Sequence, residues 1–192
     1  MKIKTFLLLL ILLVSVAFAP AQQLLHWGIK FGLDVPANKN DFSPKFTYDK
    51  TLNYNLGFQL RIGERWFGQV GIDYHINKCS LMWKDTITSN QNLELGYLTV
   101  PLQAGFHIVQ NDNVSFRIML GFQYKVLVYL SKNDIGIDRN YFQVHNMDLM
   151  GGLGLDFYSF TFDIGYRKSL FPIVADSKHY RDMLSLSLGL NF

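Results

Sequence analysis

The chain has 192 residues, which is enough for one domain with a sizeable core. Charged residues make up 17% of it, below the roughly 25% of a usual soluble domain, and aromatic residues make up 15%. The 18 basic and 15 acidic residues nearly balance. This balance argues against a nucleic-acid partner, because phosphate binding needs a concentrated basic surface.

The segment 1–21 has the features of a secretory signal peptide. A basic start is followed by an apolar run, 6–16, that is too short to span a bilayer comfortably. Small residues favour cleavage between Ala21 and Gln22, which leaves 22–192 as one mature domain. A cut two residues earlier is a weaker alternative, because proline would follow it. An uncleaved membrane anchor is the other interpretation.

Eight segments of the mature chain alternate between apolar and polar residues with a period of two, which predicts strands. In chain order they are 27–35, 56–62, 69–77, 98–108, 114–128, 146–156, 160–167 and 184–192. The connections alternate between long (36–53, 78–92, 131–143, 168–182) and short (63–65, 110–113, 158–159). Pro101 lacks the amide that a strand ladder uses, so it predicts a bulge or local bend in the fourth segment.

This pattern predicts an all-β fold, an eight-stranded antiparallel up-and-down transmembrane β-barrel. A soluble sandwich or lipocalin-like barrel would also alternate, but its outer face would carry many charges. Here the polar face is rich in Gly, Ser and Gln. Aromatic residues lie at the ends of the apolar face, where an aromatic girdle would meet the membrane–water interface. Those aromatic residues are Trp27, Trp66, Tyr74, Tyr124, Tyr166 and Phe192. The predicted location is the outer membrane of a Gram-negative bacterium, after export.

The predicted inner face carries five basic and five acidic residues. They are Lys30, Asp34, Arg61, Asp73, Arg117, Lys125, Asp148, Asp156, Asp163 and Arg167. An eight-stranded barrel has an interior just wide enough for side chains to fill. Charges buried there must pair, because an unpaired buried charge is strongly destabilising. The balanced set therefore predicts a plugged, hydrogen-bonded lumen and argues against a solute-conducting pore.

No catalytic or metal-binding pattern stands out from this background. The histidines are His26, His75, His107, His145 and His179, and none has the HxxxH or HExxH spacing of a metal site. Cys79 is the only cysteine, so no intrachain disulfide forms. We therefore expect no enzymatic activity, cofactor or metal. A lipid-modifying enzyme that uses His179 with Ser177 or Ser169 is the less favoured alternative.

The sequence of residues 97–102, Tyr-Leu-Thr-Val-Pro-Leu, resembles a strand typical of the small outer-membrane β-barrel family of Bacteroidota, the PorT-like or "porin family" proteins. The resemblance extends to the leader and to the segments GIKFGLDV (28–35), GGLGLDF (151–157) and LSLSLGLNF (184–192). It implies the same fold and location. Because a few members are linked to protein secretion across the outer membrane, it also implies a possible accessory role there.

The expected function is a non-enzymatic barrel whose long extracellular loops have a structural or partner-binding role. Expected partners are outer-membrane lipid and lipopolysaccharide, the outer-membrane assembly machinery, and an extracellular or secretion-system protein. The terminal Phe192 resembles the aromatic signal that the assembly machinery recognises. Basic and aromatic residues of the first two long loops are candidates for partner contact: Lys45, Phe46, Tyr48, Lys50, Met82 and Trp83.

Overall fold

The structure is a computed structural model that describes most of residues 25–192. The described residues are 25–37, 41–43, 46–48, 52–83, 90–111, 113–132, 139, 142–172 and 180–192. The predicted signal peptide, 1–21, and the cleavage site at Ala21 and Gln22 lie outside these residues. Within the described ranges, no helix is long and apolar enough to cross a membrane.

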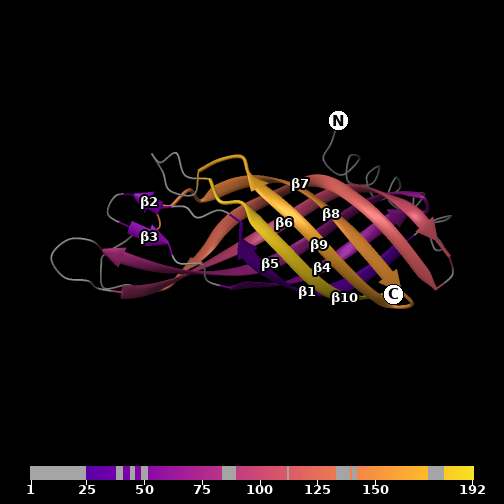
Figure 1. The fold of residues 1–192 in the computed structure, drawn as a ribbon, viewed down its shortest axis with the longest axis horizontal. Coiled ribbons are helices and arrows are strands. Elements are labelled where there is room, and N and C mark those ends of the chain that lie inside the picture. The colour runs from indigo at the N-terminus through magenta and orange to yellow at the C-terminus, as the bar shows by residue number, and fades with distance from the viewer. Residues whose placement is uncertain are drawn as a thin grey trace, which may run out of the picture.

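The described residues form ten strands in one antiparallel sheet (Figure 1). The strands are β1 (Leu25–Pro36), β2 (Asp41–Ser43), β3 (Phe46–Tyr48), β4 (Asn53–Gly63), β5 (Trp66–Trp83), β6 (Asn90–Gln110), β7 (Val114–Leu130), β8 (His145–Phe157), β9 (Phe160–Ser169) and β10 (Met183–Asn191). Strands β1 and β4 to β10 close into a barrel, because β1 pairs with β10 and β5 with β6. The predicted all-β, eight-stranded antiparallel barrel is confirmed.

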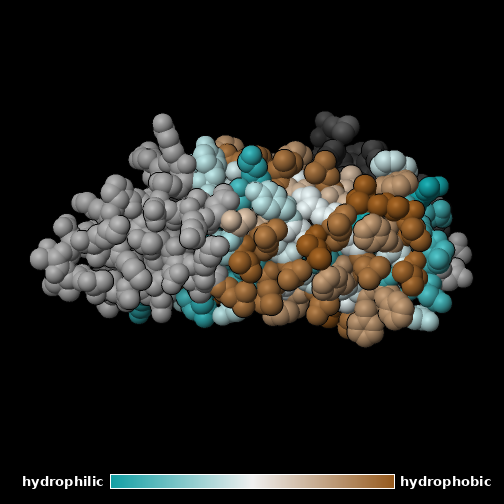
Figure 2. Space-filling model, viewed as in Figure 1, coloured by the Kyte–Doolittle hydropathy of each residue, from teal (hydrophilic) through white to brown (hydrophobic). Residues whose placement is uncertain are grey.

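The barrel wall has apolar side chains outside and polar side chains inside. On β1, the side chains of Trp27, Ile29 and Phe31 are about half exposed, whereas Asp34 is fully buried. The same alternation on the other strands produces the broad brown band of apolar residues in Figure 2. A membrane barrel needs apolar side chains on the face that meets lipid and polar side chains in its narrow lumen. The exposed apolar wall and buried polar interior fit this requirement.

Two of the predicted long connections contain further strands. Strands β5 and β6 stay paired as far as Met82 and Asn90, so most of the predicted connection 78–92 is a hairpin that extends beyond the barrel. Strands β2 and β3 lie within the predicted connection 36–53, and β3 pairs with the end of β5. The prediction missed these strands because it relied on alternating apolar and polar residues. Outside the bilayer, a strand does not have one face in lipid and one in the lumen, so it can pair without that alternation.

Of the bulge or local bend predicted at Pro101, the bulge is wrong. The register between β5 and β6 is the same on both sides of it, and Pro101 pairs with Gln123 of β7. Gly71 of β5 faces it, and a Cβ added to Gly71 would lie 3.2 Å from Pro101 Cγ. The missing amide leaves a local gap in the β5–β6 pairing without shifting the register. The register shifts of β6 lie elsewhere, between Gly96 and Tyr97 and near His107.

Candidate functional site

All ten charged residues expected in the lumen lie on the inner face of the barrel, and each forms an ion pair with another of the ten. They come from β1 (Lys30, Asp34), β4 (Arg61), β5 (Asp73), β7 (Arg117, Lys125), β8 (Asp148, Asp156) and β9 (Asp163, Arg167). No side chain in this set is more than 15% exposed. We call this set the lumen network.

The part of the lumen network nearest the short turns is centred on Arg117, whose side chain is fully buried. Its guanidinium forms ion pairs with Asp156 and Asp163, and it donates to Thr161 Oγ1 at 2.7 Å. Arg61 approaches Asp156 from the other side, with its NH1 3.0 Å from Asp156 Oδ2. The charges of two arginines and two aspartates therefore cancel in one layer of the lumen. Buried charges need such partners, because little water is present to solvate them.

A buried aromatic ring lies at the short-turn end of the lumen. Phe67 is 4% exposed and lies between two cationic or polar groups. The guanidinium of Arg61 lies 4.9 Å from the centre of its ring, and the imidazole of His107 lies 4.7 Å from it. His107 Nδ1 donates to the carbonyl oxygen of Glu64 at 2.6 Å, which ties this stack to the turn between β4 and β5.

A second layer of the lumen network, nearer the long connections, is centred on Asp34. Its carboxylate forms an ion pair with Arg167 and accepts from Asn55 Nδ2 at 3.0 Å. His75 Nδ1 lies 2.9 Å from Asp34 Oδ2. Four residues from strands β1, β4, β5 and β9 thus meet at one carboxylate across the barrel.

The hydrogen bonds of Gln123 determine the tautomer of His75. Gln123 Oε1 accepts from Arg167 at 3.1 Å, so its amide nitrogen donates to Thr99 Oγ1 at 2.8 Å and to His75 Nε2 at 3.1 Å. His75 then carries its hydrogen on Nδ1 and donates it to Asp34. The ten charged residues of the lumen network are five bases and five acids.

Some of these ion pairs join two strands that are not neighbours. A glycine on the strand between them leaves room for the two side chains to meet on the inner face. Lys30, Gly57 and Asp73 lie opposite one another on β1, β4 and β5. Because Gly57 has no side chain, Lys30 Nζ reaches across it to Asp73 Oδ2 at 3.1 Å. A Cβ on Gly57 would collide with the Asp73 carboxylate. The glycine is therefore part of the site.

The same arrangement recurs on the other side of the barrel, where Arg117, Gly154 and Asp163 lie opposite one another on β7, β8 and β9. We predict that Gly154→Ala lowers the free energy of unfolding by about 1–3 kcal/mol, the usual cost of overpacking. The added Cβ would lie 2.5 Å from both Arg117 Cζ and Asp163 Oδ1. Denaturant unfolding of the barrel in lipid vesicles measures the change.

Gly68→Ala is the matched control for this substitution, because a Cβ on Gly68 would meet no atom within 4 Å. Gly68 also lies within a strand, but on the exposed face of β5, whereas Gly154 is buried on the lumen face. We expect its unfolding midpoint to stay at the wild-type value. Equal midpoints for the Gly154 and Gly68 variants would show that the lumen accommodates the methyl group without loss.

The long-connection end of the lumen combines a polar cluster with an apolar one. Lys125 Nζ lies 2.7 Å from Asp148 Oδ2, and Ser169 Oγ lies 2.8 Å from both Asp148 Oδ1 and the carbonyl oxygen of Arg181. Beside them, a buried apolar cluster packs between β6 and β7: Leu93, Leu95, Tyr97, Leu127 and Phe142. This end of the barrel therefore buries apolar side chains as well as ion pairs.

A family model described as outer membrane protein beta-barrel domain matches residues 20–175. The chain belongs to this family. It is therefore an outer-membrane β-barrel protein, and the apolar wall described above is its membrane-facing surface. No curated protein sequence matches the chain.

Solved structures of outer-membrane barrels share the fold at low sequence identity. The outer membrane enzyme PagL aligns with a TM-score of 0.53 and 13% identity, over 86% of this chain and 98% of PagL. The outer membrane protein OprG from Pseudomonas aeruginosa aligns with a TM-score of 0.49 and 14% identity, over 87% of this chain and 95% of OprG. The PagL match supports the fold alone, because identity this low says nothing about activity.

Uncharged residues that sequence reasoning did not single out lie on the inner face of this outer-membrane barrel, among the charges of the lumen network. They are Asn55, Gln59, Gln69, Thr99, Gln103, Gln123, Thr161 and Asn191, and His75 joins them. Each lies at an inward position of its strand, so alternation identifies its direction. Nothing in the sequence shows which of these amides and hydroxyls bridge two charges, because the bridges cross the lumen between distant strands.

Other candidate chemistry in the outer-membrane barrel has limited support among the described residues. They contain no group of three or more His, Cys, Asp or Glu residues that could hold a metal ion. Ser169 is buried and lies against two acceptors, so it faces the lumen and not the membrane surface. His179 and Ser177 lie outside the described residues. Outside the lumen, Tyr124 OH lies 2.7 Å from His145 Nδ1.

Proposed function

We propose that this protein is a non-enzymatic outer-membrane barrel with a plugged lumen, which holds its long connections on the extracellular side for a structural or partner-binding role. The observation that carries the proposal is the lumen network, in which each of the ten charged residues has a partner of opposite charge. A conducting pore would instead need groups that face a continuous column of water.

Both ends of the lumen support a plugged interior. Phe67 is buried at the short-turn end, with Arg61 and His107 beside its ring. At the other end, side chains of β6 and β7 form a buried apolar cluster with Phe142. An ion that entered from either side would have to break paired buried charges, each of which is strongly stabilised by its partner. The barrel therefore serves as an anchor and not as a route for solutes.

The long connections are the part of the molecule that this anchor presents. The β5–β6 hairpin extends past the barrel, with β2 and β3 beside it, at the left end of Figure 1. Since outer-membrane barrels place short turns in the periplasm, this end faces outward. The side chains of Lys45, Phe46, Tyr48, Lys50, Met82 and Trp83 lie outside the described part of the chain.

Single-channel recording tests the proposal. We expect the purified barrel, reconstituted in planar lipid bilayers, to show no conductance above that of the protein-free membrane. Stepwise openings that depend on the amount of inserted protein would contradict the plugged lumen. The heat-dependent shift of the folded barrel on SDS gels must be checked on the same sample, because only a closed ladder resists SDS before boiling.

The resemblance to the small barrels of Bacteroidota supports a finer version of the partner-binding role, as an accessory of protein secretion across the outer membrane. It rests on residues 97–102 and the Gly-rich strands that carry the resemblance. Profiling of secreted proteins after deletion of the gene separates the two versions. An unchanged set of secreted proteins would remove the secretion role and leave the general anchoring role intact.

The absence of enzymatic activity is also part of the proposal. PagL is an outer membrane enzyme with the same fold, so the fold alone does not decide the point. Ser169, one candidate nucleophile, is engaged inside the lumen with Asp148 and the Arg181 backbone. A change in lipid A mass on deletion or overexpression of the protein would overturn this part of the proposal.

A further inference from the structure

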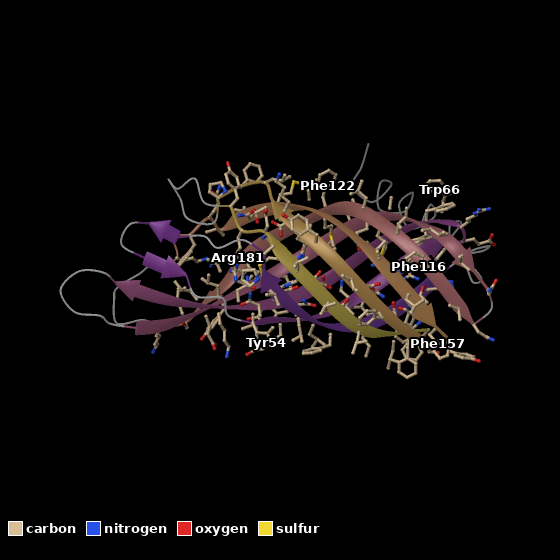
Figure 3. The ribbon with its side chains drawn as sticks, viewed as in Figure 1. Tyr54, Trp66, Phe116, Phe122, Phe157 and Arg181 are labelled. Atoms are coloured by element: carbon tan, nitrogen blue, oxygen red, sulfur yellow. The ribbon has the colours of Figure 1, made fainter. Side chains whose placement is uncertain are left out.

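Two aromatic rings and one arginine lie together at the short-turn end of the barrel, on the outer side of β5 and β6. Trp66 pairs with Phe106, and the centres of their rings are 4.7 Å apart. The guanidinium of Arg65 lies 5.2 Å from the centre of the Phe106 ring. Trp66 is 74% exposed, and Figure 3 labels it at the end of the barrel away from β2 and β3. We call these three residues the arginine–aromatic patch.

The tight turn between β4 and β5 holds the backbone of Arg65 next to β6. Gly63 has a φ of +123°, which glycine adopts at little cost, so the chain reverses within a few residues. The carbonyl oxygen of Arg65 accepts from the backbone amide of His107 at 2.9 Å. Arg65 is therefore placed beside Phe106 before any ligand binds, which lowers the entropy that binding would cost.

The guanidinium of Arg65 keeps its N–H donors available for an anion. Its side chain contacts the Phe106 ring, and within the described ranges it forms no ion pair or hydrogen bond. Arginines of the lumen differ in this respect, because Arg61, Arg117 and Arg167 each pair with an aspartate. Contact with an aromatic ring leaves the edge of a guanidinium free to donate hydrogen bonds.

The arginine–aromatic patch is continuous with the membrane-facing wall. Phe106 lies opposite Ile118 of β7, and Ile118 lies opposite Leu153 of β8, both of which are exposed. Further exposed aromatic residues lie at the same end of the barrel: Trp27, Phe157, Tyr158, Phe160 and Phe192. Aromatic residues of outer-membrane barrels gather at the level of the lipid headgroups, and short turns face the periplasm. The patch therefore meets the headgroups of the periplasmic leaflet.

We propose that the arginine–aromatic patch binds one phospholipid of the periplasmic leaflet through its phosphate. The planar N–H pairs of Arg65 match two phosphate oxygens, and the rings of Trp66 and Phe106 contact the glycerol and the upper acyl chains. Continuity with the apolar wall favours a lipid over a periplasmic protein as the occupant. The inference goes beyond the proposed function, because an anchor needs an apolar wall but no selected lipid.

Native mass spectrometry of the folded barrel, titrated with dioleoylphosphatidylglycerol in detergent micelles, tests the proposal. We expect one tightly bound lipid per barrel. Dioleoylglycerol has the same chains without the phosphate, and it should bind about ten-fold more weakly. Arg65→Gln should weaken phosphatidylglycerol binding about ten-fold, because it removes charge-assisted hydrogen bonds, and should leave dioleoylglycerol binding unchanged.

Glu64→Gln is a second variant, which leaves Arg65 in place. Glu64 is the exposed acid next to Arg65, so its removal should strengthen phosphatidylglycerol binding about two-fold by relieving repulsion. Lys168→Gln is the matched control, since Lys168 is also an exposed cation of the outer wall but lies near the long-connection end of β9. It should leave the affinity within about two-fold of wild type. The heat-dependent gel shift shows that each variant is folded.

Several results would overturn the phospholipid site. Equal affinity of the wild-type barrel for phosphatidylglycerol and dioleoylglycerol would show that the apolar wall alone retains the lipid. Wild-type affinity in folded Arg65→Gln would remove the arginine from the site. A larger loss with Lys168→Gln than with Arg65→Gln would place the phosphate at the other rim. In a parallel titration with lipopolysaccharide, a loss of its binding in Arg65→Gln without a loss of phosphatidylglycerol binding would place the patch in the opposite leaflet.

Discussion

Replacing Arg117 with methionine should lower the free energy of unfolding of the barrel by about 3–5 kcal/mol, the usual loss when one partner of a buried ion pair is removed. Arg117 is fully buried and pairs with both Asp156 and Asp163. Methionine has a similar length and leaves no large cavity, but it leaves Asp163 without a cation and Thr161 Oγ1 without its donor. Asp156 keeps its ion pair with Arg61.

Denaturant unfolding of barrels refolded into lipid vesicles measures this loss, with the heat-dependent gel shift as a check of the folded state. The double variant Arg117→Met, Asp163→Asn is the informative partner. It removes the orphaned charge, and replacing a buried pair by uncharged groups is often close to neutral. We therefore expect the double variant to be more stable than Arg117→Met alone.

Lys78→Met is a matched control for charge removal, because Lys78 forms an exposed ion pair with Glu94. Such pairs contribute little in water. Its unfolding midpoint should remain close to wild type. If Arg117→Met proves as mild as Lys78→Met, the lumen admits enough water to solvate Asp163, and the plugged lumen is wrong along with the predicted loss.

The alternation of residues was enough to predict the barrel wall, because lipid and lumen impose opposite demands on successive side chains. It placed Lys30 and Asp34 inward without any structural information. It did not predict that Lys30 would pair with Asp73, two strands away, because that contact depends on the register and on the missing side chain of Gly57. The partner of an inward charge is a property of the closed barrel and not of any one strand.

The sequence did not predict features that depend on contacts with neighbouring strands. Pro101 predicts a bulge on local grounds, yet Gly71 on the next strand makes room for its ring and the register is kept. The sequence predicts only an inward histidine at His75, but Asp34 and Gln123 form hydrogen bonds with its two ring nitrogens. Both outcomes depend on residues far away in the chain.

The second large effect should follow from Phe192→Ala, at the seam that closes the barrel. The backbone of Phe192 exchanges two hydrogen bonds with Trp27, at 2.7 and 3.1 Å. The two rings stack with centroids 4.7 Å apart, and Trp27 also stacks on Phe58 at 6.2 Å. Loss of the Phe192 ring removes this contact, which should reduce the stability of the folded barrel by about 1–2 kcal/mol. The backbone pairing at the seam remains available to alanine.

Trp27→Ala separates the packing of Phe192 from the role we propose for it as an assembly signal. It removes the same ring contact from the other side of the seam, together with the stacking of Trp27 on Phe58, so Trp27→Ala should lose at least as much stability as Phe192→Ala after refolding in vesicles. If the assembly machinery recognises Phe192 itself, only Phe192→Ala should reduce, several-fold, the heat-shifted barrel recovered in outer-membrane fractions of cells. An equal reduction with Trp27→Ala would assign the effect to packing. Normal recovery of Phe192→Ala would remove the signal role, because the ring would then contribute only to the aromatic girdle at the membrane surface.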